Sequence, residues 1–244
     1  VSPDDVEGDR LTVRGDEAHH LLRARRHRPG DVVEVIDGRG MHYSVRLELV
    51  EGDHVVCAIL ECKHGQGESG IDLELAPALI KGQRFDFVIE KATELGVVSI
   101  LPTLTERGVV KPGSGNKLHR WNRLCLAAAK QCGRSLVPEV ASSAALGAVV
   151  STMVGRNDLV LMAAPGSGSR PLEQCLDGRP LRRLGLLIGP EGGFSPKELS
   201  LGSDAGAGLF RWGDRTLRAD TASVVLTAIV MYEAERRSTT NRSA

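Results

Sequence analysis

The sequence predicts an α/β protein in two parts: a smaller N-terminal β domain and a larger C-terminal domain built on a mostly parallel sheet. Strand-like runs joined by tight turns fill the first part of the chain, a polar glycine-rich stretch follows, and strands then alternate with helices to the end. With 244 residues, the chain is long enough to bury a sizeable core.

The N-terminal part contains three strand-like runs, at residues 32–36, 42–50 and 54–60. Short turns rich in glycine and aspartate separate them, so we expect a meander that closes into a small barrel. Before these runs, the stretch EAHHLLRARRHRPGD predicts a short helix that ends near Pro29 and Gly30.

The stretch CKHGQGESG, at residues 62–70, is polar and has no periodicity, which is typical of a linker. We therefore expect one domain over residues 1–65 and another over residues 71–244. The elements expected in the second domain are a helix over 85–95, a strand at VVSILP, a helix over 116–133, strands at LVLMAA and LGLLIG, a helix from Ser195, a strand near 209–212 and a helix over 220–237.

Composition limits the function classes. Lys plus Arg equals Asp plus Glu at 31 each, so attraction to nucleic acid must come from local clusters. The five cysteines are never spaced C-x-x-C and the histidines lack ligand spacing, which argues against a disulfide framework and a metal site. No apolar run reaches the length of a membrane span. We expect a cytoplasmic protein with no metal and no membrane partner.

A glycine-rich turn in LLIGPEGGFSPKEL follows an apolar strand and precedes a helix, a place where open α/β sheets bind ligands. The letters SPKE form a capping box that begins the helix at Ser195. The turn fits neither the dinucleotide nor the P-loop pattern, and Glu191 would repel phosphate. S-adenosyl-L-methionine, which has an adenine, a sulfonium and no phosphate, fits it. A tight turn with Glu191 tied to a neighbouring arginine is the alternative, and spacing alone favours that alternative.

A second candidate stretch, WGDRTLRADTA, leads into an apolar helix. Arg215 and Arg218 lie in the loop before it, and Asp220 or Thr221 can cap it. Such arginines are usually surface residues or partners of carboxylates, but near the glycine-rich turn one could stabilise developing negative charge. The helix is apolar on nearly every side, so it must be buried in a core or against another subunit.

Two basic clusters are candidates for RNA contacts. Arg23, Arg25, Arg26 and Arg28 lie beside the expected barrel, and arginine suits both phosphates and bases. Arg120, Arg123, Lys130 and Arg134 fall on one side of the helix expected over 116–133. A solvated polar face explains the second cluster nearly as well, with Cys125 and Cys132 packing in the core. The loop PGSGSRP either lines the same cleft as the glycine-rich turn or only reverses the chain.

The ordered motifs HHLLRARRHRPGDVVEVIDGRG, KGQRFDFVIEKATELGV, KQCGRSLVP, LLIGPEGGFSPKEL and WGDRTLRADTA run through essentially the whole chain. In this order they resemble the RsmE family, the small-subunit (16S) ribosomal RNA uridine N3-methyltransferases of the SPOUT (trefoil-knot) superfamily. The resemblance implies a PUA-like RNA-binding barrel, a knotted methyltransferase domain, S-adenosyl-L-methionine as cofactor, and a homodimer that acts on ribosomal RNA or the assembled small subunit.

The resemblance also implies site residues. The cofactor residues would be Ala163, Gly189, Pro190, Gly192, Gly193, Trp212, Gly213, Thr216 and Leu217. Arg218 would stabilise the uracil anion, with Asp220 or Glu191 as the general base, although a structural or orienting role suits Glu191 better.

Three departures from the family pattern stand out: Asp220 replaces the usual glutamate, Trp212 the usual leucine, and MAAPGSGS an acidic residue. The alternatives are another knotted RNA methyltransferase, acting on a ribose 2′-oxygen or a tRNA base, and a non-catalytic RNA-binding module. A nicotinamide-dependent oxidoreductase is least favoured, because the dinucleotide fingerprint is missing.

Overall fold

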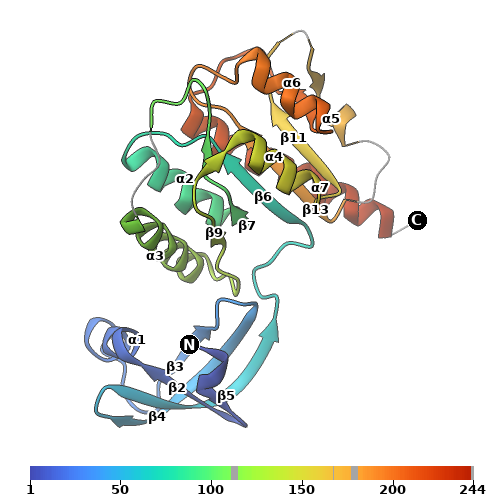
Figure 1. Cartoon of the computed structure of the whole chain (residues 1–244). Helices are drawn as coiled ribbons and strands as arrows, with labels where there is room; N and C mark the ends of the chain where they lie inside the picture. The colour runs from blue at the N-terminus through green and yellow to red at the C-terminus, as the bar shows by residue number, and fades with distance from the viewer. Residues whose placement is uncertain (111–114, 167, 177–180, 243–244) are drawn as a thin grey trace. The chain divides into compact units, whose positions relative to one another are not determined.

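The computed structural model describes residues 1–110, 115–166, 168–176 and 181–242 (Figure 1). The chain divides into two compact units. The first consists of Val1–Glu68 and Ala129–Val137, and the second of Ser69–Ala128 and Pro138–Ala244. A segment from the middle of the sequence therefore belongs to the N-terminal unit.

The first unit is built on an antiparallel sheet with strand order β1-β2-β5-β4-β3. Its strands are β1 (Val6–Glu7), β2 (Arg10–Arg14), β3 (Val32–Ile36), β4 (Met41–Glu51) and β5 (His54–His64). A 3₁₀ turn (Pro3–Asp5) precedes them, and helix α1 (Gly15–His19) with a π-helical turn (His20–Ala24) follows β2. The Val1 amino group donates to Ile36 O at 3.0 Å, joining the chain start before β1 to the opposite edge strand, as a sheet that curls into a barrel requires.

Alternating side chains of these strands form the core of the first unit. Val45 and Leu47 of β4 and Val55 and Cys57 of β5 are all buried, which is the period of two expected of a sheet with one buried face. Burial raises the pKa of the Cys57 thiol to about 11, so this cysteine is an inert apolar side chain.

The second unit is built on a seven-stranded parallel sheet with strand order β12-β14-β11-β13-β6-β7-β9. The strands are β6 (Asp72–Pro77), β7 (Val97–Ile100), β9 (Glu139–Val140), β11 (Leu159–Ala163), β12 (Arg170–Pro171), β13 (Arg183–Ile188) and β14 (Gly208–Arg211). A separate parallel pair joins β8 (Thr103–Leu104) to β10 (Ala144–Ala145).

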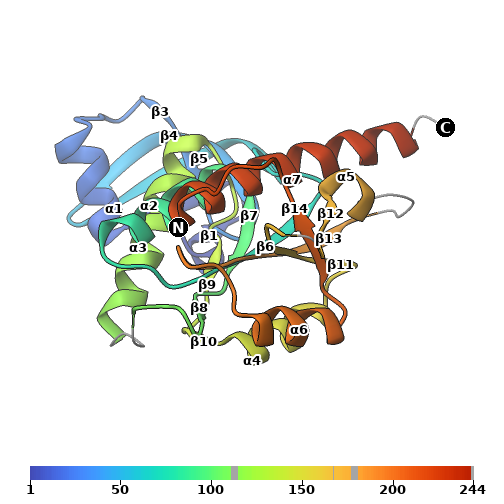
Figure 2. The same cartoon turned by 90° about the horizontal axis from the view of Figure 1, so that it is seen from above.

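Helices cover both faces of this sheet. They are α2 (Gln83–Glu94), α3 (Gly115–Cys132), α4 (Leu146–Val154), α5 (Leu172–Cys175), α6 (Pro196–Asp204) and α7 (Ala219–Arg242). In Figure 2, α2 and α7 lie on one side of the strands and α4 and α6 on the other. The central strand β13 is buried from Leu184 to Ile188 because it is covered on both faces, and this is why its sequence is a continuous apolar run.

The path of the chain after β13 positions the site. It turns through residues 189–195, forms α6, adds β14 on the far side of β11, and returns through residues 212–218 to α7, which contacts β13 and β6. This return across the sheet is the crossing that a trefoil-knot topology requires.

The main predicted elements are confirmed, including all three N-terminal strands, the helices α2, α3 and α7, and the buried strands β11 and β13. Sequence reasoning missed α4, because LGAVVSTMV is as apolar as a strand. The expected linker is more ordered than its composition suggests, since β5 continues to His64 and Ser135 N donates to Gln66 O at 3.0 Å.

Candidate functional site

The glycine-rich turn lies between the end of β13 and the start of α6, and its glycines are required by its geometry. A Cβ on Gly189 would lie 3.2 Å from the backbone nitrogen and ring of Phe194, and Gly193 has φ +66°. The capping box is confirmed: Glu198 N donates to Ser195 Oγ at 3.2 Å, and Ser195 N donates to a Glu198 carboxylate oxygen at 2.8 Å. Glu198 also accepts from Glu106 N at 2.8 Å, which ties the helix start to the segment after β8.

This turn forms one wall of a cavity of about 310 Å³. It is lined by the end of β11 with the next residues (163–165), the turn itself (188–194), parts of the loop from β14 into α7 (210–212 and 215–217) and the first turns of α7, together with Arg107 and Leu199. Of the residues carried over by the resemblance, those that line the cavity are Ala163, Gly189, Pro190, Glu191, Gly192, Gly193, Trp212, Thr216 and Leu217. Gly213, Arg218 and Asp220 are not among its lining residues.

The cavity suits a flat, mostly uncharged ligand. Its inner wall is apolar and buried, formed by Ile188, Phe194, Phe210 and Leu226. Strand ends and the glycine-rich turn bring backbone N–H and C=O groups to its edge, and the volume falls at the lower end of the roughly 300–1,000 Å³ typical of small-molecule sites. The buried apolar wall therefore fits the adenine of S-adenosyl-L-methionine, and three arginines, Arg107, Arg211 and Arg215, also line the cavity.

Two arginines that the sequence did not single out hold the turn, and one of them, Arg107, also lines the cavity. Arg107 Nη1 donates to Gly192 O at 2.7 Å and to Phe194 O at 3.5 Å. Arg84 Nη1 donates to Glu191 Oε1 at 3.0 Å, and both side chains are close to half exposed. The alternative left open by the sequence, Glu191 tied to an arginine, is thus present. No local signal marked either arginine, because their partners lie 85 to 107 residues away in the chain.

Arg218 and Asp220 lie where the chain enters α7, beside the cavity-lining Leu217 and Ala219. Arg218 is exposed. Asp220 is partly buried in the first turn of α7 and accepts a hydrogen bond from Thr221 N at 2.9 Å.

The candidate RNA contacts fall into different environments. Arg23, Arg25, Arg26 and Arg28 are all exposed on the π-helical turn and the loop after it. Arg123 is also exposed, whereas Arg120 forms an ion pair with Asp86.

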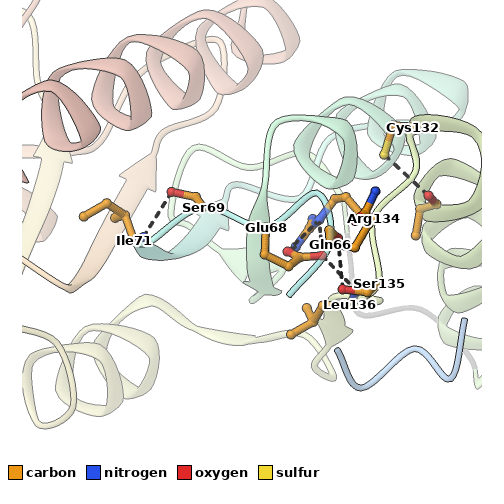
Figure 3. A network of polar contacts seen from close by, with 9 residues as sticks. Gln66, Glu68, Ser69, Ile71, Cys132, Arg134, Ser135 and Leu136 are labelled. Carbon is orange, nitrogen blue, oxygen red and sulfur yellow. Dashed lines mark hydrogen bonds and ion pairs between the residues drawn. The ribbon is translucent and has the colours of Figure 1, made fainter. Parts of the chain in front are cut away.

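The placement of Arg134 in an exposed basic stripe is wrong. Helix α3 ends at Cys132, and Gly133, with φ +77°, turns the chain so that the helical spacing does not continue to Arg134. The Arg134 side chain is 2% exposed and Nη2 donates to a Glu68 carboxylate oxygen at 2.7 Å (Figure 3). RNA phosphates cannot reach this guanidinium, so Arg134 has a structural role. Cys132, expected in the core, is exposed, while Cys125 is buried.

Within the residues that the structure describes, no group of three His, Cys, Asp or Glu side chains could hold a metal ion. The helices described there include none that is both long and apolar enough to cross a membrane.

Comparison with known proteins places this fold and cavity in a class. A family model described as an RNA methyltransferase domain matches residues 67–231, and one described as an RNA methyltransferase PUA domain matches residues 13–60. The fold, its cavity and these two matches thus define a two-domain RNA methyltransferase, as predicted.

Individual relatives identify the family within this class. The ribosomal RNA small subunit methyltransferase E of Synechocystis is 35% identical over 93% of this chain and 75% of its own length. The crystal structure of ribosomal RNA small subunit methyltransferase E from Neisseria gonorrhoeae bound to S-adenosyl methionine has a TM-score of 0.82 at 27% identity, over 93% of this chain and 94% of that one. A Legionella pneumophila methyltransferase structure with bound SAM has a TM-score of 0.82 at 29% identity, over 95% and 96%. The chain belongs to the ribosomal RNA small subunit methyltransferase E family.

Proposed function

We propose that this protein transfers the methyl group of S-adenosyl-L-methionine to N3 of a uridine in small-subunit (16S) ribosomal RNA, free or in the assembled subunit. The observation that carries the proposal is the apolar cavity bounded by the glycine-rich turn and the β14–α7 loop, in a chain of this family. Residues 1–65 would bind RNA and residues 71–244 would hold the cofactor and perform the transfer.

The cofactor, when bound, supplies an electrophilic methyl group on a sulfonium. The chain contributes a buried apolar wall, at Ile188, Phe210 and Leu226, that excludes water from the transfer. The strand ends and the turn supply fixed backbone groups that orient the ligand, so that the methyl faces the incoming base. Gly213, outside the cavity lining, serves the bend of the loop, since its φ is +65°.

N3 of uracil must lose a proton, and negative charge then spreads onto the neighbouring carbonyl oxygens. Arg218 is exposed beside the cavity, and among the residues that the structure describes it forms no ion pair with a carboxylate, so its guanidinium is available to stabilise that charge. Asp220 is the better candidate for the base, because Glu191 is occupied by Arg84. Glu191 then acts by holding the turn.

A homodimer accounts for the surface of α7. Residues 222–232 of this helix are apolar on nearly every side, yet Val225 and Ile229 are only partly buried and Tyr232 is 63% exposed. Phe87, on the neighbouring helix α2, is 46% exposed. A second copy of the chain covering this surface would bury apolar area that the monomer leaves in water.

The test is to incubate the protein and S-adenosyl-L-methionine with small ribosomal subunits and with naked small-subunit RNA. Methylated uridines are then mapped by mass spectrometry and by reverse-transcription stops. Methylation at N3 blocks the pairing edge and gives a stop. A methylated product without a stop would point to the ribose 2′-oxygen, and failure to bind S-adenosyl-L-methionine would favour a non-catalytic RNA-binding module.

Arg218→Ala tests the assignment of the charge-stabilising group. We expect the rate of transfer to fall about 100-fold or more while cofactor affinity stays unchanged, as for loss of one anion-stabilising donor. Arg182→Ala, which removes an exposed arginine at the other end of the strands, is the matched control. Near wild-type transfer by Arg218→Ala would show that another group stabilises the anion.

A further inference from the structure

Trp212 is an accessible aromatic side chain beside the cavity. The chain has only two tryptophans, and aromatic residues make up 3% of it. Trp121 is buried, with its ring 4.8 Å from that of Phe85, whereas Trp212 is 37% exposed and lines the cavity. Leaving an indole in water has a free-energy cost, so an exposed tryptophan at a ligand site calls for a partner.

The cavity has an apolar interior and a distinct rim. Ile188, Phe210 and Leu226 form the buried interior, which a cofactor would fill. Trp212 and Arg215 are exposed lining residues that belong to the rim. When the cofactor fills the interior, the side chains of the rim remain accessible to the second substrate. In an RNA methyltransferase the second substrate is the nucleotide to be modified.

Arg215 supplies a cation on the same loop as Trp212. Its Nη2 atom lies 4.0 Å from the position that a Cβ on Gly213 would occupy, so the guanidinium folds back along the loop toward the residue that follows Trp212. Among the described residues, no carboxylate forms an ion pair with Arg215, and the side chain is exposed. An aromatic face beside a guanidinium is the pairing that binds an unstacked RNA base and its phosphate.

We propose that Trp212 and Arg215 form the subsite for the target nucleotide: the extruded base stacks on the Trp212 indole, and Arg215 contacts a phosphate next to it. The inference rests on the proposed function, because it takes the interior of the cavity as the cofactor site. It assigns to these side chains the recognition of RNA and not of the adenosine moiety.

Tryptophan fluorescence tests the stacking directly. Wild-type protein is titrated first with S-adenosyl-L-methionine and then with a transcript of small-subunit ribosomal RNA. Trp212→Phe supplies the signal of Trp121 alone, which is subtracted. We expect the Trp212 signal to be quenched by the RNA and to be little changed by the cofactor. Quenching by the cofactor alone, with no further change on adding RNA, would overturn the proposal in favour of adenine stacking.

Steady-state kinetics give the second readout. Trp212→Ala should raise the KM for RNA about tenfold, the size expected for loss of one base-stacking contact, while Trp212→Phe keeps most of the affinity. Arg215→Ala should also raise this KM and reduce the salt dependence of RNA binding by about one unit of slope. An unchanged KM for RNA in Trp212→Ala, or a loss confined to cofactor affinity, would overturn the proposal.

The two proposals fail in different ways. If the wild-type protein methylates no RNA, the proposed function is wrong, but quenching of Trp212 by RNA would still establish the subsite. If the wild type methylates RNA and Trp212 is not quenched by RNA, only the subsite is wrong. Melting temperatures of both Trp212 variants are measured first, so that a loss of fold is recognised before either kinetic result is interpreted.

Discussion

Two of the ion pairs that join an arginine to a distant glutamate differ in burial. Arg134 and Glu68, in the N-terminal unit, have side chains 2% and 15% exposed. Arg84 and Glu191, at the glycine-rich turn, have side chains 43% and 45% exposed. Glu68 accepts from Arg134 through both carboxylate oxygens and also from Leu136 N at 2.9 Å, whereas Glu191 accepts one bond from Arg84.

The difference shows how burial decides what a motif arginine does. Water screens the Arg84–Glu191 pair, so it can orient a turn and rearrange at small cost. Removing Arg134 leaves the Glu68 carboxylate, which is only 15% exposed, without this cation. Residue type and helical spacing made Arg134 look like a phosphate contact, but its buried surroundings make it part of the core.

The largest expected effect is on stability. Arg134→Ala should lower the free energy of unfolding by about 3–5 kcal/mol, because it leaves the Glu68 carboxylate buried without its cation. Urea denaturation followed by circular dichroism measures the loss. Arg134→Met combined with Glu68→Gln removes both charges and should recover part of the stability. If the Arg134→Ala variant is as stable as the wild type, the Arg134–Glu68 pair contributes no more to stability than the exposed Arg84–Glu191 pair.

The N-terminal basic cluster should give the next largest effect, on RNA affinity. Arg25→Ser with Arg28→Ser removes two exposed guanidinium groups, and we expect the slope of log affinity against log salt to fall by about 1.5. The matched control, Arg10→Ser with Arg46→Ser, removes the same charge from exposed strand positions of the same unit. Filter binding at several salt concentrations measures both. If the slope falls equally in the two double variants, the net charge of the unit, and not this cluster, attracts RNA.

Features that depend on residues close together in the sequence were predictable, and features that depend on residues far apart were not. The strands β3 to β5, the capping box at Ser195 and the cavity-lining turn were predictable, because alternation, caps and glycine-rich turns are local. The contacts of Arg84 and Arg107 with the turn join residues far apart in the chain, so no local pattern predicts them. Arg134 was misplaced because the helical spacing was extended past Gly133, where the backbone leaves the helix.

The exposed pair should matter little for stability. Glu191→Gln and Arg84→Met should each change the free energy of unfolding by no more than about 1 kcal/mol, and their coupling in a double-mutant cycle should be of the same size. Cofactor affinity, measured by calorimetry, should fall by a similar factor in both single variants, because each releases the same turn. If Glu191→Gln abolishes transfer while Arg84→Met does not, Glu191 acts on the substrate and not only on the turn.

The smallest expected effect concerns Asp158, a carboxylate held by backbone and not by a guanidinium. Asp158 Oδ2 accepts from Arg183 N at 2.8 Å and from Arg182 N at 2.9 Å, at the start of β13. These bonds, that from Arg183 first, hold the pKa of Asp158 below its ordinary value of 3.8. A lowered pKa means that the charged form stabilises the fold, and that this contribution is complete above the ordinary value and declines as the pH falls below it.

Asp158→Asn keeps one side-chain oxygen as an acceptor but removes the charge. It should melt slightly below the wild type at about pH 6, and the difference should shrink as the pH is lowered through and below 3.8. Thermal melts across this range measure it. A difference that stays constant with pH would mean that the shape of the side chain, and not its charge, holds the start of β13. The charge of Asp158 would then add little to stability, as in the exposed Arg84–Glu191 pair and unlike the buried Arg134–Glu68 pair.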